Sequence, residues 1–422
     1  MRILHHTLNY PPDGNSTADL QGELGVELSR LGHDVVALTA TPNANQDAEA
    51  EGRQPLTRRW FGLLFTSEHQ GVRVFHASIP VKGSRVAGRI KDYLRFCVLS
   101  VAAGATTIPR PDAVLVISPP LTIGISGWIV ARARRARFVY VVQEIYPDIA
   151  VSLGVLTNPR VIRLMEALER FIYGRADRIV VISDWFERRL IEKGVPGTKI
   201  EVIQNFVDAE FVAPGPRRNS FSTEHGLDER FVALYAGNIG LTQSLESLLA
   251  AATRLEDIPD IQIVVIGGGT RFAWLSSEVE TGRYPNVILL PYQPRSLVPE
   301  MYAACDVGLV PLKAGTARET FPSKIYTIMA AGRPAIASAD ADTELTWVVE
   351  EARCGWAVGP DDPVSLADAI TGAFERRDQL PAMGMRGRAY VELHHAKPLV
   401  VGMYADLLES LVASMHGADS VA

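Results

Sequence analysis

The chain has 422 residues, nearly half of them hydrophobic, and a formal net charge of −6 at pH 7. A chain of this length can bury two or three cores, and its acidic balance disfavours nucleic acid as a partner because nucleic-acid-binding proteins usually carry an excess of basic residues. The three cysteines have neither C-x-x-C spacing nor paired histidines nearby, so neither a disulfide framework nor a structural zinc site is expected. The N-terminal residues lack a signal-peptide layout and no apolar stretch is long enough to span a bilayer, which predicts a cytoplasmic protein.

The first half of the chain alternates short apolar runs with segments of helical periodicity. The runs predict strands at 3–8, 34–39, 72–77, 113–117, 138–142, 178–182 and 200–203. The helices predicted between them are 17–31, 86–103, 122–135, 159–173 and 185–193, the last capped by Ser183. Strand–helix alternation of this kind predicts a parallel, doubly wound sheet with right-handed crossovers.

A segment rich in Pro, Gly, Arg and Ser at 213–222 predicts a surface linker, and a second alternation follows it. The predicted strands are 231–236, 261–266, 287–290, 307–310, 335–337 and 356–358, with helices such as 244–255 and 296–304 between them. The chain is therefore predicted to be α/β, with two Rossmann-like domains, 1–212 and 223–397, facing a central cleft. A final helix at 398–415 exceeds what the second sheet needs and is a candidate to cross back onto the first domain.

The run FPSKIYTIMAAGRPAIAS, at 321–338, combines a polar turn, a helix, a glycine stop and a buried strand. Pro322 and Ser323 are predicted to begin and cap the helix, and Lys324 lies at its start. Helix N-termini at the carboxyl ends of parallel strands present unpaired N–H groups to anions. This turn therefore predicts an anion site, although a structural helix with a solvated lysine explains these residues equally well.

Glycine-rich turns follow three of the predicted strands. Gly14 and Asn15 follow the first strand, Asn238 and Gly240 follow the first strand of the second domain, and Gly267 follows the next one. Glycine lets backbone N–H groups approach a phosphate or a sugar closely, so neighbouring turns of this kind suit a diphosphate and a base. For the first turn, a plain connection between strand and helix is the more common case.

Four segments, in this order and spacing, resemble the retaining GT-B glycosyltransferases. They are residues 1–40, YVVQEIYPDIAVSLGVL, YAGNIGLTQSLESLLAA and the run at 321–338. The closest likeness is to the bacterial sugar transferases of colanic-acid and O-antigen assembly, such as the fucosaminyltransferases. The resemblance implies a hexosyl- or N-acetylhexosaminyl-transferase. Such an enzyme would move a sugar, with retention, from a nucleoside-diphosphate sugar to a saccharide or lipid-linked acceptor in the biosynthesis of surface polysaccharides or glycoconjugates.

The resemblance also implies which residues bind the donor. Lys324 would contact the diphosphate, and Tyr292 and Gln293 would cradle the base. The backbone of the turn would hold the phosphates or the transferred sugar, through Phe321, Pro322, Ser323 and Ile325. Many relatives have an Arg near Asn238 and a Lys near Gln243, and because both are missing here, Arg271 is a further candidate for leaving-group charge.

Most relatives also place two glutamates across the donor segment. Here Glu319 occupies the first position, but Thr327 replaces the second, which is expected to bind the ribose. Glu344, predicted to lie on the adjoining loop, is the candidate substitute. No cofactor and no essential metal are expected, since lysine and helix dipoles can neutralise the leaving diphosphate. The D-x-D-like triplet at 340–342 is interpreted as a solvated loop.

On the acceptor side, Glu144 leaves a buried strand and is predicted to enter the cleft. Its carboxylate could orient an acceptor hydroxyl or take its proton, or it could cap the short helix after Pro147. Many relatives have a histidine where this chain has Gln143. His5 and His6 are interpreted as hydrogen-bonded structural residues.

The segment 82–101 is both basic and apolar, and a second basic run lies at 132–137. The basic residues of the first segment include Arg85, Arg89, Lys91 and Arg95. Such clusters suit anionic lipid head groups or a pyrophosphate-linked lipid acceptor, with peripheral contact at the inner face of the cell membrane. A solvated helix face is the alternative. Two other functions stay open: a GT-B nucleotide-sugar epimerase and a non-catalytic nucleotide-sugar-binding partner subunit.

Overall fold

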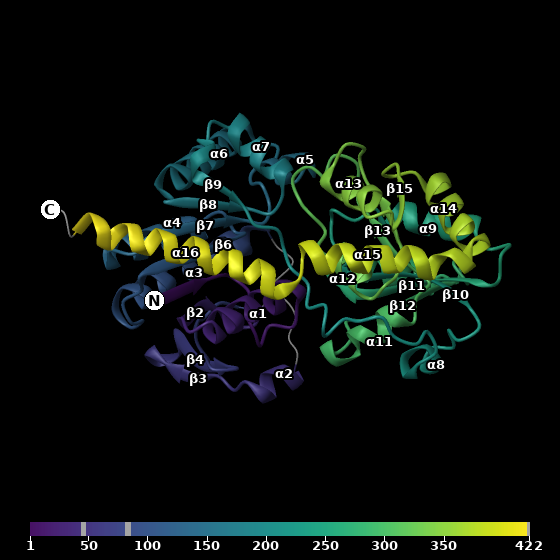
Figure 1. Ribbon diagram of the computed structural model, residues 1–422, viewed down its shortest axis with the longest axis horizontal. Coiled ribbons are helices and arrows are strands. Elements are labelled where there is room, and N and C mark those ends of the chain that lie inside the picture. Colours follow the sequence, from purple (N-terminus) through teal and green to yellow (C-terminus); the bar gives the residue numbers. More distant parts are fainter. Residues whose placement is uncertain (44–47, 81–85, 420–422) are drawn as a thin grey trace. The chain divides into compact units, whose positions relative to one another are not determined.

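The computed structural model describes residues 1–43, 48–80 and 86–419 (Figure 1). Contacts within the chain divide it into two compact units. The first unit comprises Met1–Asp148, Leu156–Gln204 and the chain from Val400 onward. The second comprises Ile149–Val155 and Asn205–Leu399. Each unit is built on a sheet of its own.

The described part of the first unit holds a nine-stranded sheet with the order β3-β4-β5-β2-β1-β6-β7-β8-β9. The strands are β1 (Arg2–His6), β2 (Asp34–Ala40), β3 (Thr57–Arg59), β4 (Leu64–His69), β5 (Val72–Ala77), β6 (Ala113–Ser118), β7 (Arg137–Val142), β8 (Arg178–Val181) and β9 (Ile200–Val202). The pairs from β5 to β9 are parallel, whereas β3, β4 and β5 form an antiparallel meander at one edge. The predicted parallel sheet is confirmed. The sequence does not predict the β3–β4 hairpin, because apolar and polar residues alternate only weakly in these two strands.

Some helices of the first unit begin at a capping side chain, namely Asn15, Asn158 or Ser183. They are α1 (Ser16–Arg30), α2 (Ala48–Arg53), α3 (Val86–Thr106), α4 (Ile123–Arg134), α6 (Pro159–Arg175) and α7 (Asp184–Glu192), and α5 (Asp148–Ser152) spans the division between the units. Ser183 caps α7 as predicted, because its hydroxyl accepts a hydrogen bond from the backbone N–H of Phe186 over 3.2 Å.

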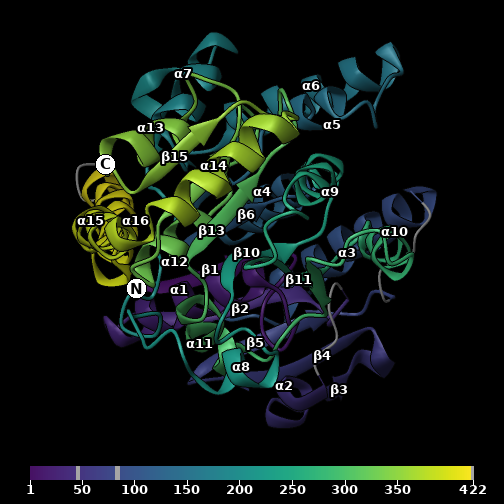
Figure 2. The same cartoon turned by 90° about the vertical axis from the view of Figure 1, so that its right-hand side faces the viewer.

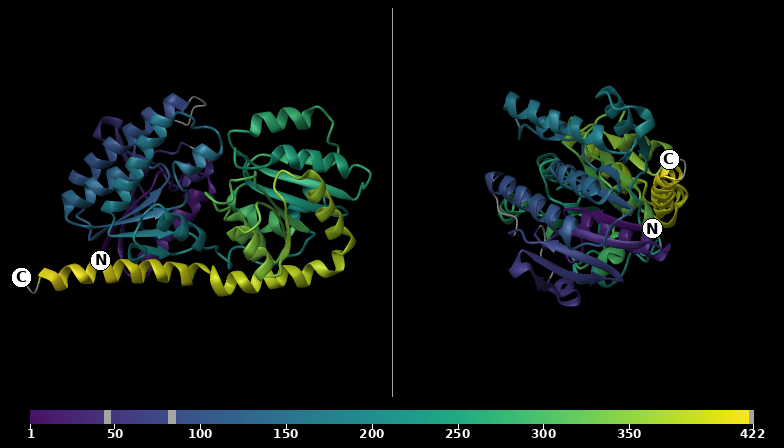
Figure 3. Two further views of the ribbon diagram at one scale, coloured as in Figure 1. Left: turned by 90° about the horizontal axis from the view of Figure 1, so that it is seen from above. Right: turned by 90° about the vertical axis from the view of Figure 1, so that its left-hand side faces the viewer.

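The last helix, α16 (Lys397–Asp419), belongs to the first unit from Val400 onward and runs along it (Figure 3). The guanidinium of Arg137 fixes it there. This group donates to the carbonyl of Leu411 over 3.1 Å and to the hydroxyl of Ser414 over 3.1 Å. The C-terminal helix therefore packs on the unit that contains the N-terminus.

The second unit holds a sheet of the order β12-β11-β10-β13-β14-β15 in its described residues, and all of its pairs are parallel. The strands are β10 (Phe231–Asn238), β11 (Ile261–Gly268), β12 (Val287–Leu290), β13 (Val307–Pro311), β14 (Ala335–Ser338) and β15 (Gly355–Val358). The helices are α8 (Ser220–Glu224), α9 (Leu245–Arg254), α10 (Phe272–Glu280), α11 (Val298–Ala303), α12 (Lys324–Ala330), α13 (Glu344–Glu351), α14 (Pro363–Glu375) and α15 (Leu380–His394), seen from a second side in Figure 2. Two doubly wound α/β units are therefore present, as predicted.

The segment 213–222 is part of the second unit rather than a linker outside it. The guanidinium of Arg217 donates to both carboxylate oxygens of Asp306, over 2.9 and 3.0 Å. Asn219 caps α8, accepting from the backbone N–H of Ser222 over 3.0 Å. The connection from the first sheet to the second passes from one unit to the other at Gln204–Asn205 instead. Pro, Gly and Ser are as typical of ordered turns as of linkers, and here they form a turn held by hydrogen bonds.

Candidate active site

Two glycine-rich strand ends lie side by side in the second unit. Strands β10 and β11 place Gly237 opposite Gly267, and both residues have positive φ, 139° and 151°. A Cβ atom on Gly267 would lie 1.9 Å from the carbonyl oxygen of Gly237, and a Cβ atom on Gly240 would lie 2.7 Å from Nδ2 of Asn238. The position of Gly267 therefore requires glycine, so that one backbone can approach the other, whereas a side chain at Gly240 would only displace the exposed Asn238 amide.

Lys324 reaches this pair of strand ends from α12. Its Nζ lies 3.7 Å from the centroid of the Tyr235 ring and 3.5 Å from Oε1 of Gln243. A Cβ atom on Gly237 would lie 3.2 Å from the same Nζ. The structure thus brings together two of the predicted donor features, the lysine and the glycine-rich end of β10.

The charge of Lys324 is not neutralised by a carboxylate in the part of the chain that the structure describes, since none forms an ion pair with it there. Burial lowers the pKa of its ammonium to about 7. The residue as a whole keeps some exposure. An anion that arrives here would meet a cation that is incompletely solvated and therefore interacts strongly with it.

The turn before α12 differs from the prediction in two ways. Ser323 stands at the N-cap position, but it has helical φ and ψ of −56° and −14° and its side chain makes no capping bond. The backbone N–H of Ile325 donates to the carbonyl of Pro322 over 3.1 Å, so it is already used within the turn. The backbone N–H groups of Phe321 and Ser323 make no hydrogen bond among the described residues. These two groups, and not that of Ile325, are available to a phosphate.

Two carboxylates hold the loop that leads into this turn. Asp361 accepts from the backbone N–H of Ala314 over 2.9 Å, and Asp340 accepts from the backbone N–H of Gly315 over 2.8 Å. Residues 340–342 lie in a loop, as interpreted, with Asp342 exposed and Asp340 partly buried and bonded to the backbone of Gly315. The carboxylate of Asp340 fixes the donor loop.

Arg271 is already paired. Its Nη1 lies 2.5 Å from Oε1 of Glu246, and its guanidinium stacks 4.0 Å above the centroid of the Trp274 ring. A second cation, Lys313, lies 3.7 Å from the same carboxylate. Because Glu246 balances the charge of Arg271, Lys324 is the better-placed group to meet an anion.

The base-binding pair is only partly brought to the site. A Cβ atom on Gly268 would lie 2.9 Å from the Tyr292 ring, so this ring covers the end of β11. Gln293 instead donates its side-chain amide to the carbonyl of Pro291 over 3.0 Å. Tyr292 therefore faces the glycine-rich strand ends, whereas Gln293 is engaged in its own loop.

Thr327 and Glu344, the two candidates for the ribose, and Glu319 lie on different elements. Glu319 belongs to the donor loop and donates its backbone N–H to the carbonyl of Thr316 over 3.2 Å. Thr327 lies on α12 and is partly buried. Glu344 is the first residue of α13 rather than part of a loop, and it is 8% exposed. Burial and, after it, the negative charge of Glu344 raise the pKa of Tyr326 on α12.

In the first unit, the turn after β1 has a structural role. The side chain of Asn15 accepts from the backbone N–H of Ala18 over 3.0 Å and so caps α1. Gly14 precedes it and is partly buried. His5 and His6 are fully buried, and burial lowers both pKa values to about 4. Their interpretation as neutral, hydrogen-bonded structural residues is confirmed, since Nε2 of His5 lies 2.9 Å from Gln21 and Nε2 of His6 lies 2.9 Å from Ser126.

Glu144 is partly buried in the segment between β7 and α5. This segment ends at Asp148, whose carboxylate accepts from Arg189 over 2.8 Å and from Lys193 over 2.7 Å. Lys193 also bonds the buried carboxylate of Glu169 over 2.7 Å. Helix α7 therefore braces the end of the loop that carries Glu144.

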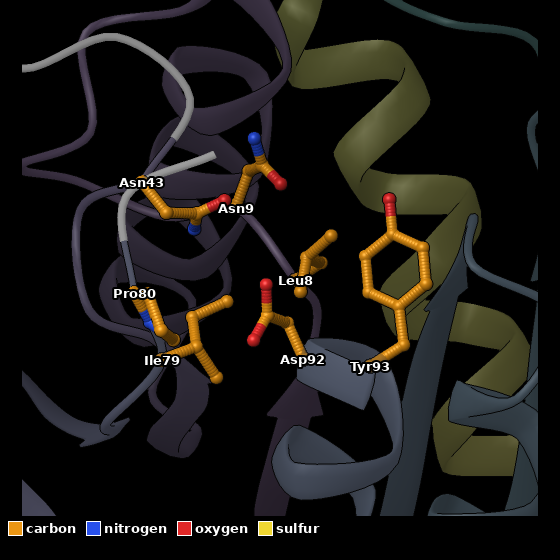
Figure 4. Close-up of a pocket in the computed structure, with 7 residues that line it drawn as sticks. All are labelled: Leu8, Asn9, Asn43, Ile79, Pro80, Asp92 and Tyr93. Carbon is orange, nitrogen blue, oxygen red and sulfur yellow. The ribbon is translucent and has the colours of Figure 1, made fainter. Parts of the chain in front are cut away.

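A hollow at the carboxyl ends of β1, β2 and β5 contains polar side chains that the sequence alone does not single out (Figure 4). It is lined by Leu8, Asn9, Asn43, Ile79, Pro80, Asp92 and Tyr93. Asp92 is the acidic residue of an otherwise basic stretch of α3, which is the one signal that could have identified it. Ligands of open parallel sheets bind at this edge.

The basic segment is only partly observed. Arg85 lies outside the described residues, as does the side chain of Arg89. Lys91 and Arg95 are exposed on α3. In the described parts of the chain, no helix is both long and apolar enough to cross a membrane.

Two families of known proteins match the chain in succession. The glycosyl transferase 4-like domain matches residues 21–205, and the glycosyl transferases group 1 match residues 217–390. Together with the two parallel-sheet units and the glycine-rich strand ends, these matches define the class. The chain belongs to the GT-B glycosyltransferases.

Relatives and solved structures agree with this class. A protein of Escherichia coli K12 that carries the name of a colanic acid biosynthesis glycosyl transferase, WcaI, is 27% identical over 83% of this chain and 86% of its own. Sucrose-phosphate synthase from Thermosynechococcus elongatus superimposes with a TM-score of 0.75 at 18% identity, covering 98% of this chain and all of the other. Anabaena HepE, solved in complex with UDP-glucose, gives a TM-score of 0.72 at 15% identity, covering 97% and 100%.

Proposed function

We propose that this glycosyltransferase moves a hexosyl or N-acetylhexosaminyl group, with retention, from a nucleoside-diphosphate sugar to a saccharide or lipid-linked acceptor. The observation that carries the proposal is the Lys324 ammonium beside the glycine-rich end of β10, without a carboxylate partner in the described chain. The complex of HepE with UDP-glucose, and the colanic acid name of the relative from E. coli, support a nucleotide-sugar donor and a role in surface polysaccharide biosynthesis.

In this proposal, Lys324 stabilises the charge that develops on the diphosphate as the bond to the sugar breaks. The backbone N–H groups of Phe321 and Ser323 add neutral donors to the same anion. The leaving group thus receives its compensation from the protein, so the proposal includes no essential metal and no cofactor. Asp340 contributes indirectly, because it holds the loop that precedes these groups.

The acceptor is assigned to the first unit. The carboxylate of Asp92 and the amide of Asn9 border a small hollow of about 20 Å³ at the carboxyl edge of the sheet, and at its rim such groups would bind sugar hydroxyls (Figure 4). Glu144, on a loop braced by α7, is the candidate to orient the reacting hydroxyl or to take its proton. Helix α3 exposes Lys91 and Arg95, and it is proposed to contact the anionic lipids of the inner face of the cell membrane.

Incubation of the purified protein with a panel of nucleoside-diphosphate sugars tests the proposal. Slow hydrolysis of one donor, without an added acceptor, is the expected result. Recovery of an epimerised nucleotide sugar would replace the proposal with an epimerase, and binding without turnover would replace it with a partner subunit that only holds the nucleotide.

The pH dependence of diphosphate binding reports on Lys324. Its ammonium is half deprotonated near pH 7, and a bound anion favours the protonated form. Binding should therefore take up a proton, and affinity should fall as the pH rises above about 7. Calorimetry of a nucleoside diphosphate in two buffers of different ionisation enthalpy measures this uptake. In a Lys324→Met variant the proton uptake should disappear, whereas equal uptake in both proteins would assign it to another group.

The ribose contact is tested by two reciprocal variants. Thr327→Glu is expected to tighten binding of the free nucleoside diphosphate several-fold, since a hydrogen bond to a charged group contributes about 1.5–3 kcal/mol. If Glu344 already binds the ribose, Glu344→Gln should weaken binding and Thr327→Glu should gain nothing. Calorimetry on the wild type and both variants separates these cases. Unchanged affinity in both variants would show that the nucleotide binds elsewhere.

A further inference from the structure

The turn between β3 and β4 holds a phenylalanine out into solvent. Trp60 and Phe61 both have positive φ, 43° and 55°, a conformation that bulky L-residues rarely adopt. The guanidinium of Arg58 donates to the carbonyl of Phe61 over 2.8 Å, and the backbone N–H of Leu63 donates to the carbonyl of Trp60 over 3.1 Å. These bonds keep the strained turn in place. As a result, Phe61 is 98% exposed.

We call residues 58–63 the hairpin tip, and this tip is linked to α3. The backbone N–H of Ser78, which follows β5, donates to the carbonyl of Leu63 over 2.9 Å. The hydroxyl of Ser78 in turn accepts from the guanidinium of Arg95 on α3 over 3.4 Å. Helix α3 packs against β5, and the hairpin continues the same sheet beyond it (Figure 2).

Both elements expose apolar side chains between basic ones. On α3, Ile90, Leu94 and Val98 recur every fourth residue and are more than half exposed, at 58%, 55% and 68%. The basic residues beside these apolar groups are Arg58 and Arg59 on the tip and Lys91 and Arg95 on α3. Asp92 on α3 lines the hollow and offsets only one of these four positive charges.

This combination fits a lipid bilayer better than another protein copy. Aromatic and aliphatic side chains suit the boundary between head groups and acyl chains, and long basic side chains reach the phosphates above it. Two copies joined through this surface would instead place four cations opposite four cations, which opposes association. The positive charge selects anionic lipids.

We propose that the hairpin tip inserts Phe61 into the interface of an anionic bilayer, beside α3. The proposal rests on the membrane contact proposed for α3 and adds a second, separate element to it. The strained turn then has a physical role: a relaxed turn would let Phe61 fold back onto the sheet, whereas the observed one presents it to the lipid.

Co-sedimentation with vesicles of phosphatidylglycerol and phosphatidylcholine tests the proposal. Phe61→Ser is expected to weaken partitioning about tenfold, and Phe61→Trp to preserve it. Leu393→Ser is the matched control, because Leu393 is 69% exposed but lies on α15 of the second unit, and it should have no effect. Phe61→Gly should also lose binding while raising the melting temperature by a few degrees, since glycine adopts positive φ without strain.

The outcomes separate this inference from the one on which it rests. If Lys91→Gln with Arg95→Gln weakens binding but Phe61→Ser does not, the contact of α3 stands and the role of the tip is overturned. If the wild type ignores anionic vesicles at low salt, both fail, whereas donor hydrolysis would be unaffected. Sedimentation velocity gives a further test. If Phe61→Ser abolishes self-association and leaves vesicle binding unchanged, the partner of the hairpin tip is a second copy of the chain and not a lipid bilayer.

Discussion

Replacing Lys324 with alanine is expected to lower turnover about 10²-fold while the protein stays folded. The ammonium lies at the end of β10 without a carboxylate partner among the described residues, so its charge is available to the leaving diphosphate. Removing a donor that acts on the developing charge lowers kcat more than it raises KM. Steady-state kinetics with the donor identified by the panel measures both constants.

Lys313→Ala is the matched control for this prediction. Lys313 also lies on the donor-side loop, but its Nζ is 3.7 Å from the carboxylate of Glu246, which it shares with Arg271. Its removal should change turnover by only a few-fold. Equal losses in the two variants would show that any nearby cation suffices, and unchanged turnover in Lys324→Ala would remove the lysine from the mechanism.

Gly267→Ala should produce the largest loss of stability of any substitution considered for this protein, about 3 kcal/mol in the free energy of unfolding. The new Cβ would lie 1.9 Å from the carbonyl oxygen of Gly237, a backbone atom that can move only if β10 shifts. The φ of 151° adds strain for any side chain. Chemical denaturation followed by tryptophan fluorescence measures the change.

Gly372→Ala, in the same unit, is expected to raise the stability rather than to lower it. Gly372 lies inside α14, and a Cβ atom at this position would have Nη1 of Arg376 as its nearest neighbour, at 3.7 Å. Alanine should therefore stabilise the helix by about 0.5–1 kcal/mol. No loss of stability at Gly267 would contradict the close approach of β10 and β11, and a loss at Gly372 would contradict the free space beside α14.

The strands of both sheets could be predicted because parallel strands are buried on both faces and so read as continuous apolar runs. The β6 run, AVLVIS, and the β11 run, IQIVVI, are of this kind. The β3–β4 hairpin could not be predicted in the same way. It lies at the edge of the sheet, where one face is solvated and Arg, Thr and Ser replace apolar residues.

The position of the donor turn in the chain could be predicted, but the contacts of its side chains could not. Local residue types were enough to mark Lys324, Gly240 and Gly267 as candidates, because glycine stops and helix starts depend on neighbours in the chain. Whether a side chain is charged, paired or already hydrogen-bonded depends on residues far away in sequence. Arg271 is the clearest case, since its partner Glu246 belongs to a different helix.

The sequence by itself thus determined the α/β architecture and the order of the parallel strands, because apolar periodicity and turn residues act over a few neighbours. Only the tertiary structure decided that Asp340 holds the donor loop, that Glu344 begins a helix and is buried, and that Phe61 stands in solvent. These features follow from which strand pairs with which and from the exact path of the loops between them. Such long-range placement depends on packing that no local pattern encodes.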